Sequence, residues 1–197
     1  MKKYTVSRTA GAPDWSGIPA LEIDTRLWCP PVDIRARAQI AWDDEALYVR
    51  LSAVEARIRA EHTGALGMPC EDSCLEFFFC PAWGDERYFN IEFNPNGCVY
   101  FGFGDGEELV RLIPEKDWFE PKAERTIDGW AIEYRVPHRL VRMFFPGYAP
   151  ASGARFRANC FKCGDLTAQE HYFSWNPVTG EVPQFHRPRD FGEMVFE

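Results

Sequence analysis

Long apolar runs are missing from this sequence of 197 residues. No stretch approaches the ~18 consecutive apolar residues of a membrane-spanning helix, so no such helix is expected. The opening Met1-Lys2-Lys3 is not followed by the apolar run of about 7–15 residues that a secretory signal contains. The sequence therefore predicts a cytoplasmic protein that is not embedded in a membrane.

Concentrated basic charge is also absent. The chain has 22 Lys and Arg against 30 Asp and Glu, a formal net charge of −8. No basic cluster is long enough to follow a phosphate backbone, so nucleic acid is not an expected partner. The nucleophile motif G-x-S-x-G is missing, and no nucleophile motif surrounds any of the four histidines, which are His62, His138, His171 and His186.

The cysteines do not indicate a disulfide scaffold. There are seven, an odd number, and without an export signal they are expected to be reduced thiols. Cys160 and Cys163 have C-x-x-C spacing, and Cys70 and Cys74 are available to complete a zinc site. Residues three apart on a strand face opposite sides, so the sequence favours ordinary buried thiols and no metal site.

Aromatic residues are plentiful, with 16 Phe, 7 Tyr and 7 Trp. Such rings suit pleated, half-buried surfaces. Short alternating runs are separated by Gly and Pro, and neither a repeat nor a linker interrupts them. The pattern predicts one domain over residues 1–197 with an all-β fold: a two-sheet antiparallel sandwich of immunoglobulin or jelly-roll type, with at most one or two short helices.

The strands can be placed from the alternation. Residues 34–54 predict a hairpin that turns at Asp43-Asp44-Glu45, and residues 73–80, 88–94 and 98–103 predict a three-stranded meander. Residues 137–145 fit one or two helical turns that begin at Pro137. Further strands are expected at residues 122–127, 130–136, 155–162, 171–175 and 194–196.

Two glutamates stand out on the meander. Alternation sends its large apolar side chains to one face and Glu76 and Glu92 to the other. If residues 81–87 form the loop, Glu76 lies directly across from Glu92. Two opposed carboxylates repel each other, so neighbouring polar groups should compensate them. The candidates from the same alternation are Arg37, Gln39, Arg50, Arg157 and Asn159.

This polar face can be interpreted in two ways. Acids, amides and guanidinium groups among aromatic rings suit a polyhydroxyl ligand, which needs hydrogen bonds at its edge and a ring against its C–H face. The plainer alternative is a solvated face whose charges pair across strands. Phe78 and Cys74 on that face are poor choices for a wet surface, which indicates a covered face or a cleft.

Three segments resemble family 9 carbohydrate-binding modules. They are Trp42 to Val49 (WDDEALYV), Glu71 to Phe78 (EDSCLEFF), and an ending with Phe173-Ser174-Trp175 and Pro188 to Gly192 (PRDFG). They occur in the family's order and span about residues 35–196. The resemblance implies a sandwich related to the DOMON-like group that binds terminal sugars between two aromatic rings, with structural calcium. The acids available for calcium are Asp43, Asp44 and Asp105, although no loop has a recognisable calcium-ligand pattern.

The resemblance also carries individual positions. Glu76 matches the family's ligand-binding Glu, and Asn159 stands where the family has Gln. Phe185 falls at one of the two sandwiching Trp positions, and Glu92 falls where the family has Arg. The second sandwiching Trp is missing, because Pro69-Cys70-Glu71 occupies that stretch.

The leading hypothesis is a non-catalytic site for a mono- or oligosaccharide. Its hydrogen-bonding groups are Glu76, Glu92 and Asn159, its ring surfaces are Phe185 and Trp175, and its margin is formed by Arg157, His186 and Arg187. One alternative is a glycoside-processing enzyme that uses Glu76 and Glu92 as its carboxylate pair. Another is an interaction domain without a small ligand. The sequence leaves the oligomeric state open.

Overall fold

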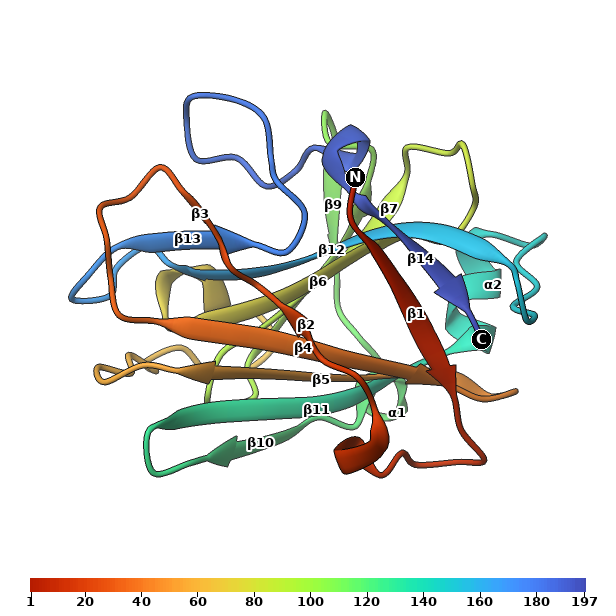
Figure 1. Cartoon of the computed structure of the whole chain (residues 1–197), viewed down its shortest axis with the longest axis horizontal. Coiled ribbons are helices and arrows are strands. Elements are labelled where there is room, and N and C mark those ends of the chain that lie inside the picture. Colours follow the sequence, from red (N-terminus) through yellow and green to blue (C-terminus); the bar gives the residue numbers. More distant parts are fainter.

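Two packed β-sheets form the molecule (Figure 1), in a computed structural model that describes all 197 residues. The first sheet contains β2 (Leu21–Glu22), β4 (Arg35–Trp42), β5 (Ala46–Val54), β10 (Lys122–Arg125) and β11 (Gly129–Pro137). The second sheet has the order β14-β12-β6-β7-β8-β9, and β13 and β3 continue it beside β12. Their bounds are β3 (Thr25–Leu27), β6 (Cys74–Cys80), β7 (Tyr88–Phe93), β8 (Val99–Gly104), β9 (Leu109–Leu112), β12 (Arg155–Gly164), β13 (His171–Ser174) and β14 (Gly192–Phe196).

The N-terminal strand β1 (Lys3–Arg8) joins the two sheets. Its first four residues pair in parallel with β14, and Ser7 and Arg8 pair in parallel with β4. Every other strand pair is antiparallel. The all-β sandwich is confirmed, and its pairing is mixed where β1 crosses from one layer to the other.

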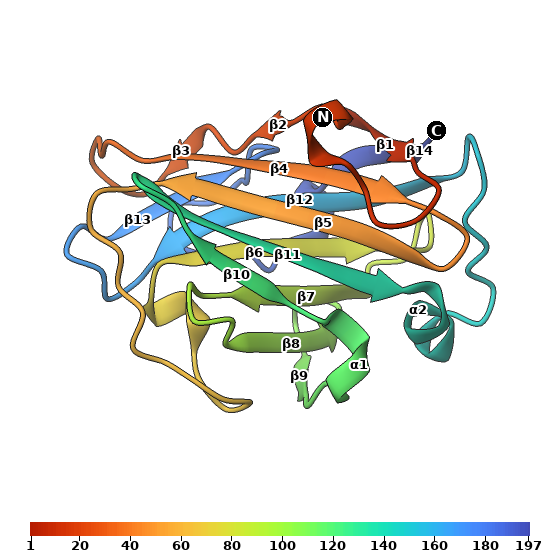
Figure 2. The ribbon, with the colours of Figure 1, turned by 90° about the horizontal axis from the view of Figure 1, so that it is seen from below.

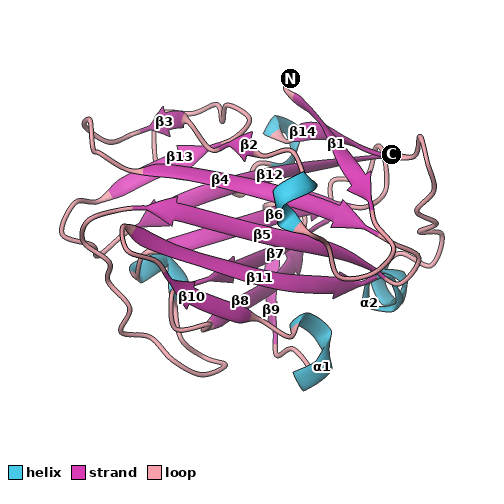
Figure 3. Ribbon diagram, turned by 60° about the horizontal axis from the view of Figure 1, so that its bottom comes forward, coloured by secondary structure: helices cyan, strands magenta, loops and turns pink.

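Helical structure is scarce, as Figure 3 shows. The two α-helices are α1 (Lys116–Phe119) and α2 (His138–Phe144), and the second confirms the helical turns expected after Pro137. There are also three single 3-10 turns, which are η1 (Trp15–Gly17), η2 (Pro69–Glu71) and η3 (Pro188–Asp190). None of these helices has the length and apolar character needed to cross a membrane.

The main core lies between the sheets, where β4, β5 and β11 cross over β12, β6 and β7 (Figure 2). It contains 36 buried residues, including the apolar sets expected on the meander. Those sets are Leu75, Phe77 and Phe79 on β6 and Phe89, Ile91 and Phe93 on β7. The predicted facing of both strands is therefore confirmed.

A charged cluster is buried at one edge of this core. Lys162 is fully buried, and its Nζ lies 3.2 Å from Glu55 Oε1 and 2.7 Å from His171 Nε2. Glu55 also accepts hydrogen bonds from Trp130 Nε1 at 2.7 Å and Ser73 Oγ at 2.9 Å. The cation of Lys162 thus has a carboxylate partner inside the sandwich.

A second apolar cluster covers part of the outer face of the second sheet. The segment of residues 176–191, between β13 and β14, arches over this face (Figure 1). Phe185 of this segment stacks on Phe161 of β12 at 4.2 Å between ring centroids, and His186 stacks on Phe78 of β6 at 5.3 Å. Phe78 and Phe161 face outward and are still fully buried, because this covering segment lies on them.

Candidate functional site

One row of side chains crosses four strands of the second sheet on its outer face. In order it consists of Phe161 on β12, Glu76 on β6, Glu92 on β7 and Tyr100 on β8. Glu76 is directly opposite Glu92, as predicted from the loop length. The two carboxylates are only 2% and 6% exposed, so neither faces open water.

A cavity of about 390 Å³ lies over this row. Its lining contains three carboxylates, Glu76, Glu92 and Asp165, and no Lys or Arg. The recess is therefore acidic and offers no cationic group to an anionic ligand. The other lining residues are Trp28, Met68, Cys70, Asn90, Tyr100, Cys163, Tyr172, Pro183, Gln184, Phe185 and His186.

Aromatic rings border the cavity at both ends of the row. Tyr172 on β13 and Trp28 after β3 lie on one side, and Trp28 is 5.7 Å from Phe185 between ring centroids. Tyr100 borders the cavity from β8, four strands from β13 and so roughly 19 Å away at the usual spacing of strands. The two glutamates thus form a floor between separate ring surfaces.

The covering segment is fixed by polar side chains of β12. Asn159 Oδ1 accepts the backbone N–H of Asn176, and its Nδ2 donates to the Asn176 carbonyl, each at 2.9 Å. Arg157 donates to the carbonyls of Pro188 at 3.1 Å and Asp85 at 2.9 Å. These bonds hold both ends of the segment that contains Phe185.

The environment of the glutamates favours their neutral forms. Burial raises the pKa of Glu92 to about 7, and the carboxylate of Asp165 adds to this rise. Burial and the charge of Glu92 raise the pKa of Glu76 well above its ordinary value. Near neutral pH the pair therefore keeps at least one proton and offers both a hydrogen-bond donor and acceptors.

Two atoms at the cavity have no hydrogen-bond partner within the protein. Asn90 Nδ2 donates to Glu92 Oε1 at 2.9 Å, whereas Glu92 Oε2 and Asn90 Oδ1 are buried and unpartnered. Buried polar atoms of this kind are rare in folded proteins and mark positions where a ligand or water completes the site. The carboxylate edge and the amide oxygen are thus available to hydroxyl groups.

Four of the residues predicted for the site line this cavity. They are Glu76, Glu92, Phe185 and His186. His186 Nδ1 lies 2.7 Å from the hydroxyl of Tyr88, and burial lowers the pKa of its ring. The structure therefore gathers the two acids, one ring and one imidazole of the predicted set.

The other four lie outside the cavity lining. Asn159 and Arg157 hold the covering segment, and Arg187 pairs with Asp190 at 3.2 Å within that segment. Trp175 belongs to the main core and is only 3% exposed. Alternation explains its position, because it continues the inward side of β13 while Tyr172 points to the cavity.

The prediction that Arg37, Gln39 and Arg50 compensate the charges of Glu76 and Glu92 is wrong. Arg37, Gln39 and Arg50 lie on β4 and β5 of the first sheet, and Arg50 is paired there with Glu133. Alternation defines which side of a strand a residue occupies and leaves open which sheet contains that strand. The charge of Arg111 offsets only part of the effect of burial on Glu92, and the pKa values of both glutamates are raised.

Several cavity residues were missed from the sequence. Trp28 was not among the predicted site residues, yet it is half-buried and borders the cavity. Tyr100 was also not among them, and its pairing with Glu92 places it on the outer face of the sheet. Tyr172 and Asn90 could have been found, because each has the outward parity of its strand.

Two of the three acids considered for calcium accept hydrogen bonds in turns, and the third, Asp44, pairs with Arg8 at 2.8 Å. Asp43 Oδ1 accepts the backbone N–H groups of Glu45 and Ala46 in the hairpin turn. Asp105 caps a later turn in the same way through Glu107 and Glu108.

The fold and the recess define a β-sandwich module with a cavity for a small ligand on one sheet face. The chain belongs to carbohydrate-binding family 9, whose family model matches residues 12–196. No curated protein sequence matches the chain significantly.

Solved structures share the whole fold. A "putative carbohydrate-binding protein" from Bacteroides uniformis is 26% identical, with a TM-score of 0.84 over 100% of this chain and 99% of its own. A family 9 module from Caldicellulosiruptor kristjanssonii in complex with cellotriose is 17% identical, with a TM-score of 0.72 over 100% and 94% of the two chains. The same kind of module from that organism in complex with glucose is 16% identical, with a TM-score of 0.72 over 100% and 96%.

Proposed function

We propose that this protein binds a neutral mono- or oligosaccharide in the cavity over Glu76 and Glu92, without cleaving it. The observation that carries the proposal is the buried carboxylate pair between ring surfaces, with Glu92 Oε2 and Asn90 Oδ1 unpartnered. Membership of carbohydrate-binding family 9 supports the same ligand class.

The chemistry of the lining favours a neutral sugar over a charged one. Three carboxylates and no Lys or Arg would repel an acidic sugar. A carboxylate pair that keeps a proton can both donate to and accept from the paired hydroxyls of a sugar. Tyr100, Trp28 and Phe185 offer ring faces for its C–H surface.

Cleavage of a glycosidic bond is the second candidate, and the raised pKa of Glu92 is the observation that favours it. A general acid needs such a pKa near the working pH. The geometry favours binding, because the two carboxylates rise side by side from one floor. In a glycosidase the two carboxyl groups flank the scissile bond.

Calorimetric titration with glucose and cellotriose, the sugars held by the two Caldicellulosiruptor structures, tests the proposal. Phe185→Ala and Glu92→Gln should each weaken binding at least tenfold, which corresponds to about 1.4 kcal/mol. Trp83→Ala is the matched control, because this ring is 47% exposed and lies outside the cavity.

The outcomes separate the alternatives. Binding without products in a chromatographic assay supports the proposal, and release of shorter sugars would establish the enzyme. Equal loss of affinity in Trp83→Ala and Phe185→Ala would place the ligand elsewhere. No binding heat with either glucose or cellotriose would reject the proposal and favour an interaction domain.

A further inference from the structure

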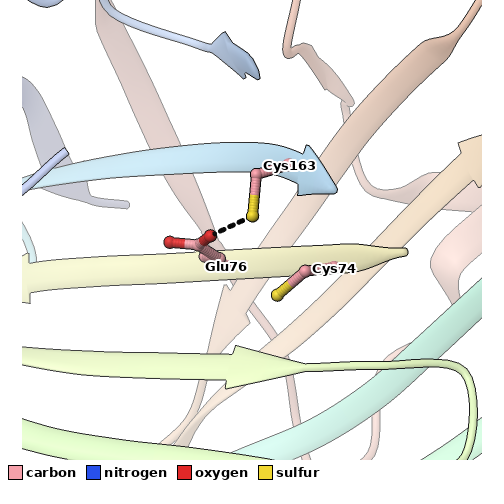
Figure 4. Close-up of side chains that lie close together, drawn as sticks. All are labelled: Cys74, Glu76 and Cys163. Carbon is pink, nitrogen blue, oxygen red and sulfur yellow. Dashed lines mark hydrogen bonds between the residues drawn. The ribbon is translucent and has the colours of Figure 1, made fainter. Parts of the chain in front are cut away.

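Three potential metal ligands meet beside the cavity, which Glu76 and Cys163 line and Cys74 does not. Cys74 and Glu76 lie on β6, and Cys163 lies directly across from Cys74 on the adjacent β12. Figure 4 shows the Cys163 thiol directed at the Glu76 carboxylate, with Cys74 beside Glu76 on the same strand. The Sγ atom of Cys163 donates to Glu76 Oε1 at 3.0 Å, and the three ligand atoms all lie within 4.8 Å of each other.

The spacing suits a single small cation. Zinc binds thiolate sulfur at about 2.3 Å and carboxylate oxygen at about 2.0–2.2 Å in a tetrahedral arrangement. Ligand atoms around such a centre are therefore roughly 3.5–3.8 Å apart. This separation lies between the 3.0 Å from Cys163 Sγ to Glu76 Oε1 and the 4.8 Å within which all three ligand atoms lie. Small rotations of side chains would give this geometry without moving the strands.

The cavity lining beside these ligands is rich in acidic groups and contains no Lys or Arg. Glu92 lies beside Glu76, and Asp165 and Cys70 line the same cavity. Glu92 is 6% exposed, and its Oε2 is buried without a partner. This unpartnered carboxylate oxygen is independent of the Cys74, Cys163 and Glu76 cluster, and it is a further oxygen donor beside it.

The donor set selects among metals. Two thiolates favour zinc or another thiophilic ion over calcium and magnesium, which prefer oxygen ligands only. Three protein ligands beside a cavity leave a fourth position for Glu92, water or a ligand hydroxyl. Full thiolate donation requires the loss of the thiol protons, which metal binding itself drives.

We propose that Cys74, Cys163 and Glu76 bind one Zn²⁺ ion at the floor of the cavity, with the fourth position directed toward Glu92 and the open space. This site uses only one cysteine of the C-x-x-C pair, because Cys160 faces the main core while Cys163 belongs to the outer cluster beside the cavity. The inference goes beyond saccharide binding and does not depend on it.

The test uses the full chain, reduced, stripped of metal with a chelator and then titrated with zinc alone. One equivalent should bind, with release of protons that calorimetry in buffers of different ionisation enthalpy detects. Cobalt as a probe should give thiolate-to-metal charge-transfer absorption and the intense visible bands of a tetrahedral site. Cys74→Ser and Cys163→Ser should each weaken zinc binding at least about hundredfold and remove the charge-transfer absorption.

Two controls keep the result interpretable. Cys160→Ala changes a thiol on the same strand that faces the core, and it should retain zinc and the cobalt spectrum. Phe185→Ala should lose sugar and keep zinc, so failure of one proposal is distinguishable from failure of the other. Near-ultraviolet circular dichroism of Cys74→Ser shows whether a loss of zinc accompanies intact packing.

Two results would overturn the site. The first is the absence of stoichiometric zinc binding by the reduced wild type. The second is zinc binding that persists unchanged in the double variant Cys74→Ser/Cys163→Ser. If both serine variants lose their packing, Glu76→Gln, which keeps both thiols, decides the question by its zinc affinity alone.

Discussion

Replacing Lys162 by Met should destabilise the fold by about 3–4 kcal/mol. At 3.2 Å, the attraction between Lys162 Nζ and Glu55 Oε1 is about 5 kcal/mol at an effective dielectric constant of about 20. Glu55 keeps its hydrogen bonds from Ser73 and Trp130 in the variant, which offsets part of the loss. Breaking a buried ion pair by removing one partner typically costs about 3–5 kcal/mol, in agreement with this figure.

The double variant Lys162→Met/Glu55→Gln tests the reasoning. It removes the stranded charge and keeps an acceptor for Trp130, so it should recover most of the lost stability. Urea unfolding at pH about 8, followed by tryptophan fluorescence, gives the free energies. Exposed Lys122→Met is the matched control and should change stability by less than about 0.5 kcal/mol. A single variant as stable as the wild type, or a double variant no better than the single, would refute the explanation.

Three further outcomes are expected. Burial and Lys162 lower the pKa of His171 from 6.5 to about 4, so the wild type loses stability as the pH falls through that range. The variant His171→Gln should lose less, by up to about 3 kcal/mol in the free energy of unfolding measured with urea. The pKa of Glu92 is raised from 4.5 to about 7, so ionisation of this buried carboxyl group destabilises the folded protein as the pH rises through that range. In chelator-treated protein, Glu92→Gln should therefore be about 3 kcal/mol more stable than wild type at pH about 8, with no gain near pH 4.5. Gly192→Ala would place Cβ 2.5 Å from the Trp175 ring and should lower stability by about 1–3 kcal/mol, visible as a lower Tm.

Local patterns in the sequence defined much of the fold. The hairpin over residues 34–54, the meander and the pairing of Glu76 with Glu92 followed from alternation and loop length. These features depend on residues that are near in the chain, where a two-residue period and a turn define the register. The strands β1, β2, β3 and β9 were not predicted. The strands β2, β3 and β9 have only two to four residues, too few for a clear alternating run, and β1 pairs with two strands from distant parts of the chain.

The candidate site was harder to predict because it combines distant segments. Trp28, Cys163 and Phe185 come together only through the pairing of β3 with β13 and of β12 with β6, and through the covering segment. Alternation identified Asn159 and Arg157 as outward residues, but it could not show that they would bond a segment lying on them. Of the three arginines assigned to the glutamates, Arg37 and Arg50 lie in the other sheet, whereas Arg157 lies in the same sheet and bonds the covering segment.

The strand that joins the two sheets gives the cavity an unexpected dependence on the start of the chain. The backbone N–H of Lys2 donates to Asn176 Oδ1 at 2.7 Å, and β1 pairs with β14, which follows the covering segment. Local opening of β1 should therefore loosen the covering segment over the glutamates. Ligand binding in the cavity and closure of β1 are then linked equilibria. Hydrogen–deuterium exchange of the β1 amides should consequently slow when a ligand binds, although none of these residues touches the recess.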